Sequence, residues 1–499
     1  MTSPGTGGRI DDILRRLDSL RADDAPTHGG HVLSYVYDSG VAELDDLARR
    51  AAAAVSGVNG LDPTTFPSVA RMEHDVIGFA ASLMHGDQAV GLVTSGGTES
   101  CVLAVKSARD RWRSVHPAAD ERPVLLAPVS VHAAFHKAAH YFDLDLDLVP
   151  VDAQGAVRAA DLVGRFSSRT AIVVVSAPNY PYGTLDPVAE VAPAAAAAGI
   201  VCHVDSCIGG WVLPFWETSA DSSEMLPPWD FRVPGVTSIS MDAHKYGFAP
   251  KGASVLLFAD RDAKRAAGFA TVRWPGYPVV NPTMLGSRSV TSLAAAWAII
   301  AYLRPESGTG VGFSGLTART RRATETVRAC IAGIRGLSVV GDPVGPLLAV
   351  RSDTAVPQAD RVDPHLWADQ VRGLGWVLQP QPGLGSDHPH TTHLTITPVT
   401  ADVVDELCAA LVTGADAVRG APPVDLSEIV TAIPQLGRSG ALDSVAAQDV
   451  LAALGLGGGG AGSAALPDQL APVMALLEVI EPERAESLLA ELIARLNED

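Results

Sequence analysis

Between about residues 90 and 260, short β-branched apolar runs alternate with alanine-rich stretches of helical spacing. This alternation is typical of a mostly parallel sheet with helices on both faces. Strands buried on both faces read as continuous apolar runs. The clearest such runs are residues 171–176, 200–204, 236–241 and 254–258. The pattern therefore predicts an α/β fold with this region in its large domain.

The N-terminal region has a different pattern. Ile10, Leu14 and Leu17 have the spacing of one apolar face of a helix. Residues 1–60 are therefore predicted to form an N-terminal helical segment. The large domain is expected to follow at residues 61–315.

A smaller α+β domain is predicted at residues 316–420. A long charged helix at about 317–332 should lead into it, and its predicted strands are 347–351 and 392–397. The change from mostly apolar strands to this mixed pattern suggests a separate core.

The chain changes character again after residue 420. Residues 421–499 are predicted to be a C-terminal extension, with a Gly-rich flexible linker at 457–463 and a terminal helix. One face of that helix is apolar and needs a partner surface, on its own chain or on another subunit. The residues of this face are Leu488, Leu489, Leu492 and Leu496.

Composition excludes some partners. The chain of 499 residues is 47% hydrophobic and 19% charged, and its formal net charge is −19. Such a chain repels polyphosphate backbones and anionic headgroups, and no run rich in Lys and Arg offsets this. The sequence therefore argues against nucleic-acid binding, and any phosphate group must be held locally by a few placed groups.

Membrane and secretory signals are weak. The longest apolar runs, such as residues 293–303, have about half of the ~20 residues that a membrane-spanning helix needs. Asp11, Asp12, Arg15 and Arg16 interrupt the N-terminal apolar residues, which argues against a signal peptide. The five scattered cysteines are too few for a secreted disulfide framework. A cytoplasmic protein without a membrane span is expected.

A glycine turn of sequence Thr-Ser-Gly-Gly-Thr-Glu-Ser occupies residues 94–100, between an apolar run and a helical pattern. Backbone N–H groups and the positive helix end meet at such a turn, where glycines let a phosphate approach and hydroxyls add donors. A turn that only caps the helix would look the same. The candidate phosphate-binding residues are Ser95, Gly96, Gly97 and Thr98.

Lys245 comes soon after the strand predicted at 236–241, which carries it to the mouth of the sheet, where ligands bind in such folds. Burial and the neighbouring imidazole of His244 would favour the neutral amine, which can condense with an aldehyde. A solvated loop lysine is the alternative.

Asp205 ends the strand predicted at 200–204, so its carboxylate belongs at the same edge of the sheet. A buried carboxylate requires a cationic partner. A protonated pyridine nitrogen is one such partner, and the pairing keeps the ring able to accept electrons. A structural salt bridge to an arginine is the alternative.

His132, His136 and His140 are spaced to share one helical face, which invites a zinc interpretation. No acidic or cysteine ligand follows at motif spacing. No metal site is therefore predicted.

The candidate residues occur along the chain in the order of a pyridoxal-phosphate site: the phosphate-binding turn, then a histidine, an aspartate and a lysine. From about residue 30 to 420 the chain resembles the sphingosine-1-phosphate lyases, which belong to the group II decarboxylase-like set of fold type I enzymes. The resemblance implies a mostly parallel central sheet and pyridoxal 5'-phosphate as cofactor. The matching segments are 66–67, 94–100, 130–138, 203–210, 236–240, 244–252, 282–283 and 286–288.

The resemblance also implies roles in the cofactor site. Lys245 would hold the cofactor as a Schiff base, Asp205 would pair with the pyridine nitrogen, and His132 would stack on the ring. Family members are homodimers with active sites at the interface, so Gly286 and Ser287 would reach the cofactor phosphate of the partner subunit. The cofactor site is completed by Ser95, Gly96, Gly97, Thr98, His203 and His244.

For the substrate, the resemblance implies retro-aldol cleavage of a phosphorylated long-chain amino alcohol into an aldehyde and phosphoethanolamine. A base removes the hydroxyl proton, the Cα–Cβ bond breaks, and the cofactor ring stores the electrons. Tyr37 and His244 are further catalytic candidates. The residues expected to face the substrate are Tyr37, Asn59, Asp62, Tyr180, Tyr182 and Lys251.

Three departures from the lyase pattern bear on the substrate. Asp62 stands where the lyases have a histidine that contacts the substrate phosphate, so like charges would meet there unless Asp62 turns away or pairs with a cation. Ser206 stands where alanine is usual, and residues 289–291 read Ser-Val-Thr in place of Pro-Gly-Gly. The last two departures lie close to the cofactor and are expected to affect substrate choice.

Two enzyme activities and one other function remain open at this stage. The favoured reaction is carbon–carbon cleavage of a β-hydroxy amine or amino acid. An α-decarboxylase would use the same site but orient a carboxylate, instead of the Cα–Cβ bond, perpendicular to the ring. In the third interpretation the protein is a scaffold whose tail helix recruits a partner. The presence of Lys245, Asp205 and His132 together argues against this interpretation.

Overall fold

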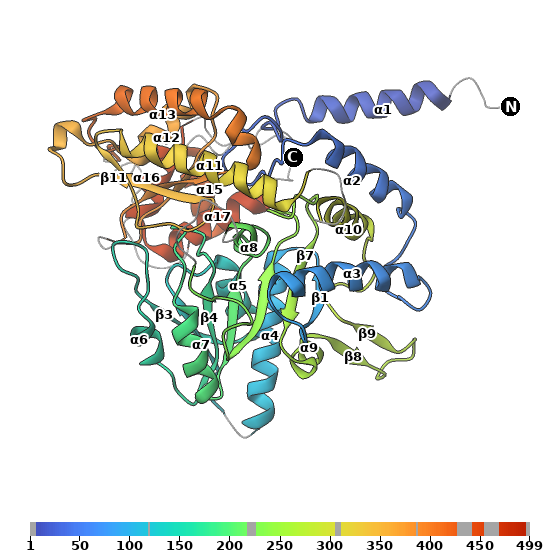
Figure 1. Ribbon diagram of the computed structural model, residues 1–499. Coiled ribbons are helices and arrows are strands. Elements are labelled where there is room, and N and C mark those ends of the chain that lie inside the picture. The colour runs from blue at the N-terminus through green and yellow to red at the C-terminus, as the bar shows by residue number, and fades with distance from the viewer. Residues whose placement is uncertain are drawn as a thin grey trace.

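The computed structural model describes residues 6–117, 120–216, 226–304, 311–385, 388–426, 442–453 and 469–495. The chain forms a large α/β domain, a smaller antiparallel domain and a C-terminal group of helices (Figure 1). The linker predicted at 457–463 and the apolar residue Leu496 lie outside the described residues.

A seven-stranded sheet of order β1-β7-β6-β5-β4-β2-β3 forms the centre of the large domain. Strands β2 to β6 pair in parallel, whereas β7 runs antiparallel to β1 and β6. The predicted α/β fold is confirmed, and each of the four runs singled out above is a strand within one residue. The strands are β1 (Val90–Thr94), β2 (Val124–Pro128), β3 (Asp145–Val149), β4 (Thr170–Ser176), β5 (Val201–Asp205), β6 (Val236–Met241) and β7 (Ser254–Phe258).

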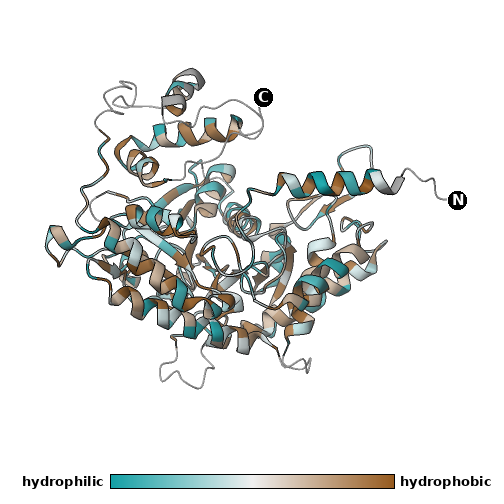
Figure 2. Cartoon of the chain, turned by 90° about the horizontal axis from the view of Figure 1, so that it is seen from above, coloured by the Kyte–Doolittle hydropathy of each residue, from teal (hydrophilic) through white to brown (hydrophobic). Residues whose placement is uncertain are grey.

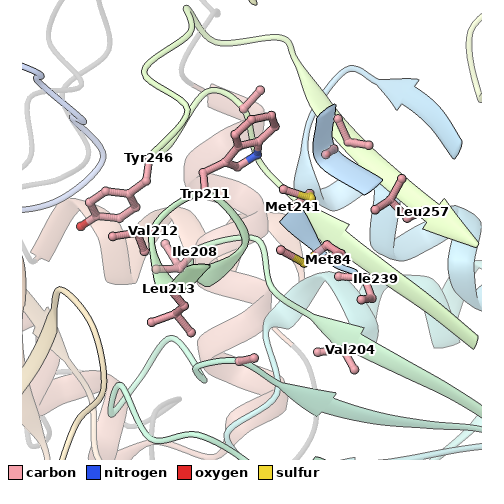
Figure 3. Close-up of a cluster of buried hydrophobic side chains, with 14 of the residues drawn as sticks. Met84, Val204, Ile208, Trp211, Val212, Leu213, Ile239, Met241, Tyr246 and Leu257 are labelled. Atoms are coloured by element: carbon pink, nitrogen blue, oxygen red, sulfur yellow. The ribbon is translucent and has the colours of Figure 1, made fainter. Parts of the chain in front are cut away.

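Helices cover both faces of this sheet, because its strands are apolar on both sides. Along β4, Val173 and Val175 pack into one core, whereas Ile172 and Val174 pack into the core on the opposite face. Trp211 lies in the first of these cores with its indole fully buried, among residues of β5, β6 and β7 (Figure 3). The sheet is therefore a rigid frame on which strand-end residues are held.

The helices of the large domain follow the predicted alternation. Residues of α2, α3, α7 and α10 contribute to the first core, and those of α4 and α5 to the second. Their bounds are α2 (Ala42–Ala54), α3 (Pro67–Leu83), α4 (Gly97–Val115), α5 (Ala133–Phe142), α6 (Ala159–Val163), α7 (Val188–Ala197), α8 (Leu213–Trp216), α9 (Arg261–Ala267) and α10 (Thr291–Leu303).

Two segments present apolar side chains to solvent. Helix α1 (Thr6–Leu20) projects from the body of the molecule, with its apolar residues exposed along its length (Figures 1 and 2). Strands β8 (Phe269–Thr271) and β9 (Val279–Asn281) form a separate two-stranded hairpin. The exposed residues of the hairpin and of the segment after it are Phe269, Val272, Trp274, Tyr277, Val280, Met284 and Leu285.

The small domain has a four-stranded antiparallel sheet of order β10-β11-β13-β12. Its helices enclose a core of its own around the fully buried Trp367. The strands are β10 (Leu337–Val339), β11 (Leu347–Ser352), β12 (Gln379–Gln381) and β13 (Thr391–Thr395), and the helices are α11 (Phe313–Ala332), α12 (Pro364–Gly373) and α13 (Val404–Val418).

The C-terminal extension docks on its own chain. Helices α15 (Ser444–Ala453), α16 (Ala471–Val479) and α17 (Pro482–Arg495) share a small core that includes Leu451, Leu476 and Leu488. The carboxylate of Asp369 in α12 accepts from the amides of Leu470 and Ala471 at 2.8 and 2.9 Å, and so caps α16. The partner surface that the tail helix requires is thus supplied within the subunit. Among helices inside the described ranges, none has both the length and the apolar character needed to cross a membrane.

Candidate functional site

The strand ends bring the predicted cofactor residues to one edge of the sheet. Strands β1, β2, β4, β5 and β6 run in the same direction, so the loops that follow them meet there. They enclose an inner cavity of about 370 Å³. Of the predicted cofactor residues, the cavity is lined by Ser95, Gly96, Gly97, Thr98, His132, Asp205, His244 and Lys245.

Lys245 forms a buried ion pair in this cavity. Its Nζ lies 3.0 Å from Oδ2 of Asp242, and the imidazole Nε2 of His244 lies 3.6 Å from the same oxygen. Burial lowers the pKa of Lys245, but Asp242, together with Tyr37, Cys207 and Asp205, outweighs burial and raises this pKa well above its usual value. The sequence predicted that burial and the neighbouring His244 would favour the neutral amine, whereas in the chain without cofactor Asp242 favours the ammonium form.

Asp205 lies at the end of β5 with its carboxylate facing the cavity. Its Oδ1 accepts from the amide of Cys207 at 3.1 Å and from the hydroxyl of Ser240 at 3.3 Å. His203, on the same strand, is fully buried, and its ring nitrogens lie 2.8 and 3.2 Å from the hydroxyls of Ser238 and Ser240. Burial lowers the pKa of His203 to about 4, so this imidazole is neutral and supports the strand beneath Asp205.

The glycine turn is held by a residue that the sequence analysis did not single out. Oε2 of Glu99 accepts from the amide and the hydroxyl of Ser95 at 2.6 and 2.7 Å, and Oε1 accepts from the amide of Met284 at 2.7 Å. The Ser95 hydroxyl is thus committed to Glu99. Glu99 is nearly buried and ties the turn to the segment that contains Gly286 and Ser287.

His132 does not share a helix face with His136 and His140. It is the N-cap of α5, with extended backbone (φ −62°, ψ 141°), and its Nδ1 accepts from the amide of Ala134 at 3.1 Å. This bond directs the ring toward the cavity, where it meets the ring of Tyr180 edge to face with centroids 6.2 Å apart. The spacing of three histidines predicted a common face because the helix start was placed too early.

An outer cavity of about 630 Å³ adjoins the inner one, and His132, Tyr180 and Lys245 line both. The outer cavity is also lined by Tyr37, Tyr182 and Lys251, which were predicted to face the substrate. The Nζ of Lys251 lies 4.6 Å from the centre of the Tyr37 ring. Burial and the nearby Lys245 lower the pKa of Lys251 to about 8. This ammonium therefore exchanges its proton near neutral pH.

The remaining predicted residues lie outside both cavities of the single chain. Asn59 Nδ2 donates to the hydroxyl of Ser287 at 3.2 Å, and a Cβ built on Gly286 would meet no atom within 4 Å. Asp62 faces its own loop, because its carboxylate accepts from the hydroxyls of Thr64 and Thr65 at 2.6 and 2.9 Å. These hydrogen bonds lower the pKa of Asp62 to about 2.

Ser206 also turns away from the cavity. It is fully buried, and its hydroxyl donates to the carbonyl oxygen of Ala177 at 2.9 Å. A residue next to Asp205 in sequence thus points to the opposite side of the strand end.

Two groups of potential metal ligands occur among the described residues, and neither includes His132, His136 or His140. Cys101, Asp205 and Cys207 lie beside the inner cavity. The other group is His365, His390 and Glu478, in which both ring nitrogens of His390 already lie within 3.2 Å of carboxylate oxygens.

The residues present fit pyridoxal phosphate. Gly97 approaches Asp242 so closely that a Cβ would lie 2.5 Å from Oδ2, so only glycine allows the turn to close over the cavity. Gly97 and Thr98 begin α4, so their amide N–H groups have no acceptor within the helix and remain available to a phosphate. The buried Nδ1 of His244 and Oδ1 of Asp242 have no hydrogen-bond partner in the described part of the chain.

Asp242 and Glu99 are the functional candidates that the sequence reasoning missed. A signal existed for both: Asp242 precedes Lys245 by three residues, and Glu99 lies in the first turn of the predicted helix, where a carboxylate is favoured. Tyr35, Gln379 and Gln381 also line the outer cavity, but they come from distant segments and carry no local signal.

Comparisons with known proteins agree with this geometry. Residues 41–270 match the family model described as the pyridoxal-dependent decarboxylase conserved domain, and residues 425–495 match the pyridoxal-dependent enzyme, C-terminal putative HTH domain. The sphingosine-1-phosphate lyase of Dictyostelium discoideum is 34% identical over 402 residues, which cover 79% of this chain and 70% of that protein. The lyase of Arabidopsis thaliana is 33% identical over 420 residues, or 82% and 73%.

Solved structures give the same picture of the fold. The sphingosine-1-phosphate lyase of Burkholderia pseudomallei superposes with a TM-score of 0.75 at 30% identity, covering 86% of this chain and 95% of that one. The glutamate decarboxylase of Lactobacillus brevis superposes with a TM-score of 0.70, over 85% and 95%, but at 18% identity it shows the fold alone.

Proposed function

Because the chain belongs to the sphingosine-1-phosphate lyase family, and is therefore a lyase that depends on pyridoxal phosphate, we propose that it cleaves the Cα–Cβ bond of a β-hydroxy amine. The observation that carries this proposal is that Lys245, Asp205 and the glycine turn line one cavity. Lys245 is the residue that binds the cofactor covalently.

Each group around the inner cavity has a part in holding the cofactor. The amides of Gly97 and Thr98, at the positive end of α4, bind the phosphate. His132 and Asp205 line the same cavity, where His132 would pack against the cofactor ring and Asp205 would bind its nitrogen. When bound, pyridoxal phosphate supplies an aldehyde that condenses with amines and a ring that accepts the electron pair released at Cα.

The outer cavity holds the reacting end of the substrate. Lys251 faces Tyr37 across this cavity and exchanges its proton near pH 8, so it takes the proton from the β-hydroxyl as the Cα–Cβ bond breaks. Tyr37, Tyr180 and Tyr182 exclude water and position the hydroxyl. A proton must then be returned to Cα, and Lys251 would supply the one it took, so the products are an aldehyde and a shorter amine.

The active enzyme is a homodimer in this proposal. Gly286 and Ser287 lie outside the cavities of their own chain, next to the exposed apolar hairpin β8–β9. A second subunit packed on the hairpin would cover these apolar residues and bring Gly286 and Ser287 to the partner's cofactor phosphate. Sedimentation analysis of wild type and Trp274→Glu tests this: a dimer that the charge dissociates is expected, and a wild-type monomer contradicts it.

A phosphorylated substrate is compatible with Asp62. Its carboxylate is occupied by Thr64 and Thr65, so it need not oppose a phosphate dianion. We predict that Asp62→His strengthens the binding of phosphoethanolamine at pH 7, and a direct titration tests this. We also place the protein in the cytoplasm, since all five cysteines are free thiols, as a reducing compartment would keep them.

Product analysis separates this reaction from an α-decarboxylase. Holoenzyme incubated with a phosphorylated β-hydroxy amine should release an aldehyde. Holoenzyme incubated with the α-amino acids that correspond to this amine should release no carbon dioxide. Carbon dioxide release without aldehyde would replace the lyase by the decarboxylase, which has the same site but a different bond aligned over it.

A further inference from the structure

A second cavity, of about 370 Å³, lies between the C-terminal extension and the small domain. It lies within the size range of small-molecule sites. Among the described residues that line it, Arg372 is the sole charged side chain. Leucines dominate the wall, including Leu477 of α16 and Leu489 and Leu492 of α17, and we name this cavity the leucine chamber.

The leucine chamber adjoins the outer cavity of the active site. Tyr35, Gln379 and Pro380 line both, so they form the wall or neck between them. Tyr35 is 64% exposed and is therefore not locked into the protein core. Lys245 lines the other end of the outer cavity. The chamber therefore lies against the wall of the cavity that contains the reactive amine.

The extension has the wrong surface charge for a nucleic acid. Its described residues carry two basic side chains, Arg484 and Arg495, and Arg484 is buried. A polyphosphate backbone would meet mainly like charge on these helices. The acidic residues are Asp425, Asp443, Asp449, Glu478, Glu481, Glu483, Glu486 and Glu491.

The extension has apolar side chains that face the leucine chamber in addition to those buried in its own core. Leu451, Leu476 and Leu488 are buried in the core of α15 to α17. All three also line the chamber, together with Leu489, which is 46% exposed. Apolar surface that faces an open space remains unfavourable until an apolar group covers it.

We propose that the leucine chamber binds the hydrocarbon tail of the substrate while the amine reaches Lys245, so that the C-terminal extension selects long-chain amines. This inference rests on the proposed lyase function for the identity of the tail. The outer cavity, with its tyrosines and Lys251, takes the polar end, and the chamber takes the apolar end. The extension is then a specificity module of the enzyme.

Binding of straight-chain 1-alkanols to the holoenzyme tests the chamber without any chemistry. In the wild type, affinity should rise on the order of fourfold per added methylene group, because each buried methylene contributes a similar free energy. Leu489→Trp fills the chamber and should flatten this rise. Ile493→Trp, on the same helix but 66% exposed and not lining the chamber, is the matched control and should preserve it. Calorimetric titration gives the affinities.

The proposal for the chamber is overturned if the affinity for alkanols does not depend on their chain length. It is also overturned if this dependence is the same in the wild type, Leu489→Trp and Ile493→Trp. The proposed function is tested separately by aldehyde release from a short-chain and a long-chain β-hydroxy amine. Leu489→Trp should raise KM for the long chain about tenfold and leave kcat and the short chain unchanged. If the rate of aldehyde release does not depend on the chain length of the substrate, the proposed role of the chamber is refuted and the lyase function is not. If alkanols bind but no aldehyde is released from any substrate, the lyase function is refuted, and the assignment of the chamber to the substrate tail is refuted with it.

Discussion

The ammonium of Lys245 and the carboxylate of Asp242 form a buried ion pair, with Nζ 3.0 Å from Oδ2. Asp242 is 1% exposed and also faces His244. The pair keeps the amine that we propose binds the cofactor protonated and in place before an aldehyde arrives. Capture of the aldehyde requires the neutral amine, so Asp242 controls the pH at which the cofactor loads.

Asp242→Asn should therefore move cofactor loading to lower pH. Without the carboxylate, burial lowers the pKa of Lys245, and the midpoint for loading should fall by about 1 to 3 pH units. The rise of cofactor absorbance after mixing apoenzyme with pyridoxal phosphate measures this midpoint. Asp161→Asn, an exposed acid paired with Arg158, is the control. An unchanged midpoint in Asp242→Asn would contradict the role of the pair.

Lys245→Arg should abolish turnover while the fold is kept. Arginine preserves the charge that Asp242 requires, so the cost of an unpaired buried carboxylate is avoided. It has no amine able to condense with the cofactor, so aldehyde release should fall to the uncatalysed background and the absorbance of lysine-bound cofactor should vanish. Lys245→Ala should lose activity as well, and it should also be less stable in urea. Activity in either variant would refute the assignment of Lys245.

Ser206→Ala should affect stability and leave substrate choice unchanged. The buried hydroxyl donates to Ala177, so its loss should cost about 0.5 to 1.5 kcal/mol in the free energy of unfolding. Urea denaturation measures this cost, and the ratio of kcat/KM for two substrates measures selectivity. A changed ratio with unchanged stability would restore the earlier expectation that this serine affects the substrate.

The elements that were predicted from sequence are those with local patterns. The strands were visible because β4 and β7 are continuous apolar runs, and because β5 and β6 have Val or Ile at several buried positions. Asp205 and Lys245 could be placed because each lies at or just beyond the end of such a strand. The parallel sheet then brings them together without further information.

The features that were missed depend on contacts between side chains. Asp62 was expected to face the substrate, yet two threonines immediately after it satisfy its carboxylate. His132 was assigned to a helix face, yet it caps that helix. The apolar face of the tail helix gave no indication of its partner, because Leu488 packs in one core with Leu451 of the separate helix α15. Sequence spacing carries no information on such contacts.

His390 is an ionic clamp between the small domain and the extension, and it should make their contact depend on pH. Its Nε2 lies 3.1 Å from Asp363 and its Nδ1 lies 3.2 Å from Glu478 of α16. Burial lowers the pKa of His390, but the two carboxylates outweigh burial and raise it to about 10. The ring of His365, stacked at 4.4 Å, has a lowered pKa and stays neutral, chiefly through burial.

The direction in which stability changes with pH follows from these pKa shifts. A histidine whose folded pKa is raised contributes stability that is fully present below its unfolded pKa of about 6.5 and is lost as pH rises through about 10. The pKa values of Asp363 and Glu478 are lowered, so their contribution is lost only as pH falls below the usual carboxylate range. The clamp should therefore be strongest between about pH 5 and 6.5.

His390→Gln should lower the melting temperature most within that window, and its difference from the wild type should shrink steadily toward pH 10. His388→Gln, in the same loop, is the matched control and should show no such trend. Because Glu478 also accepts from the amide of Gly383, in the loop that borders the outer cavity, KM for a long-chain amine should rise in parallel with loss of the clamp. A difference between His390→Gln and wild type that grows as pH rises would show that His390 is held as a neutral group and that the two carboxylates do not bind a cation.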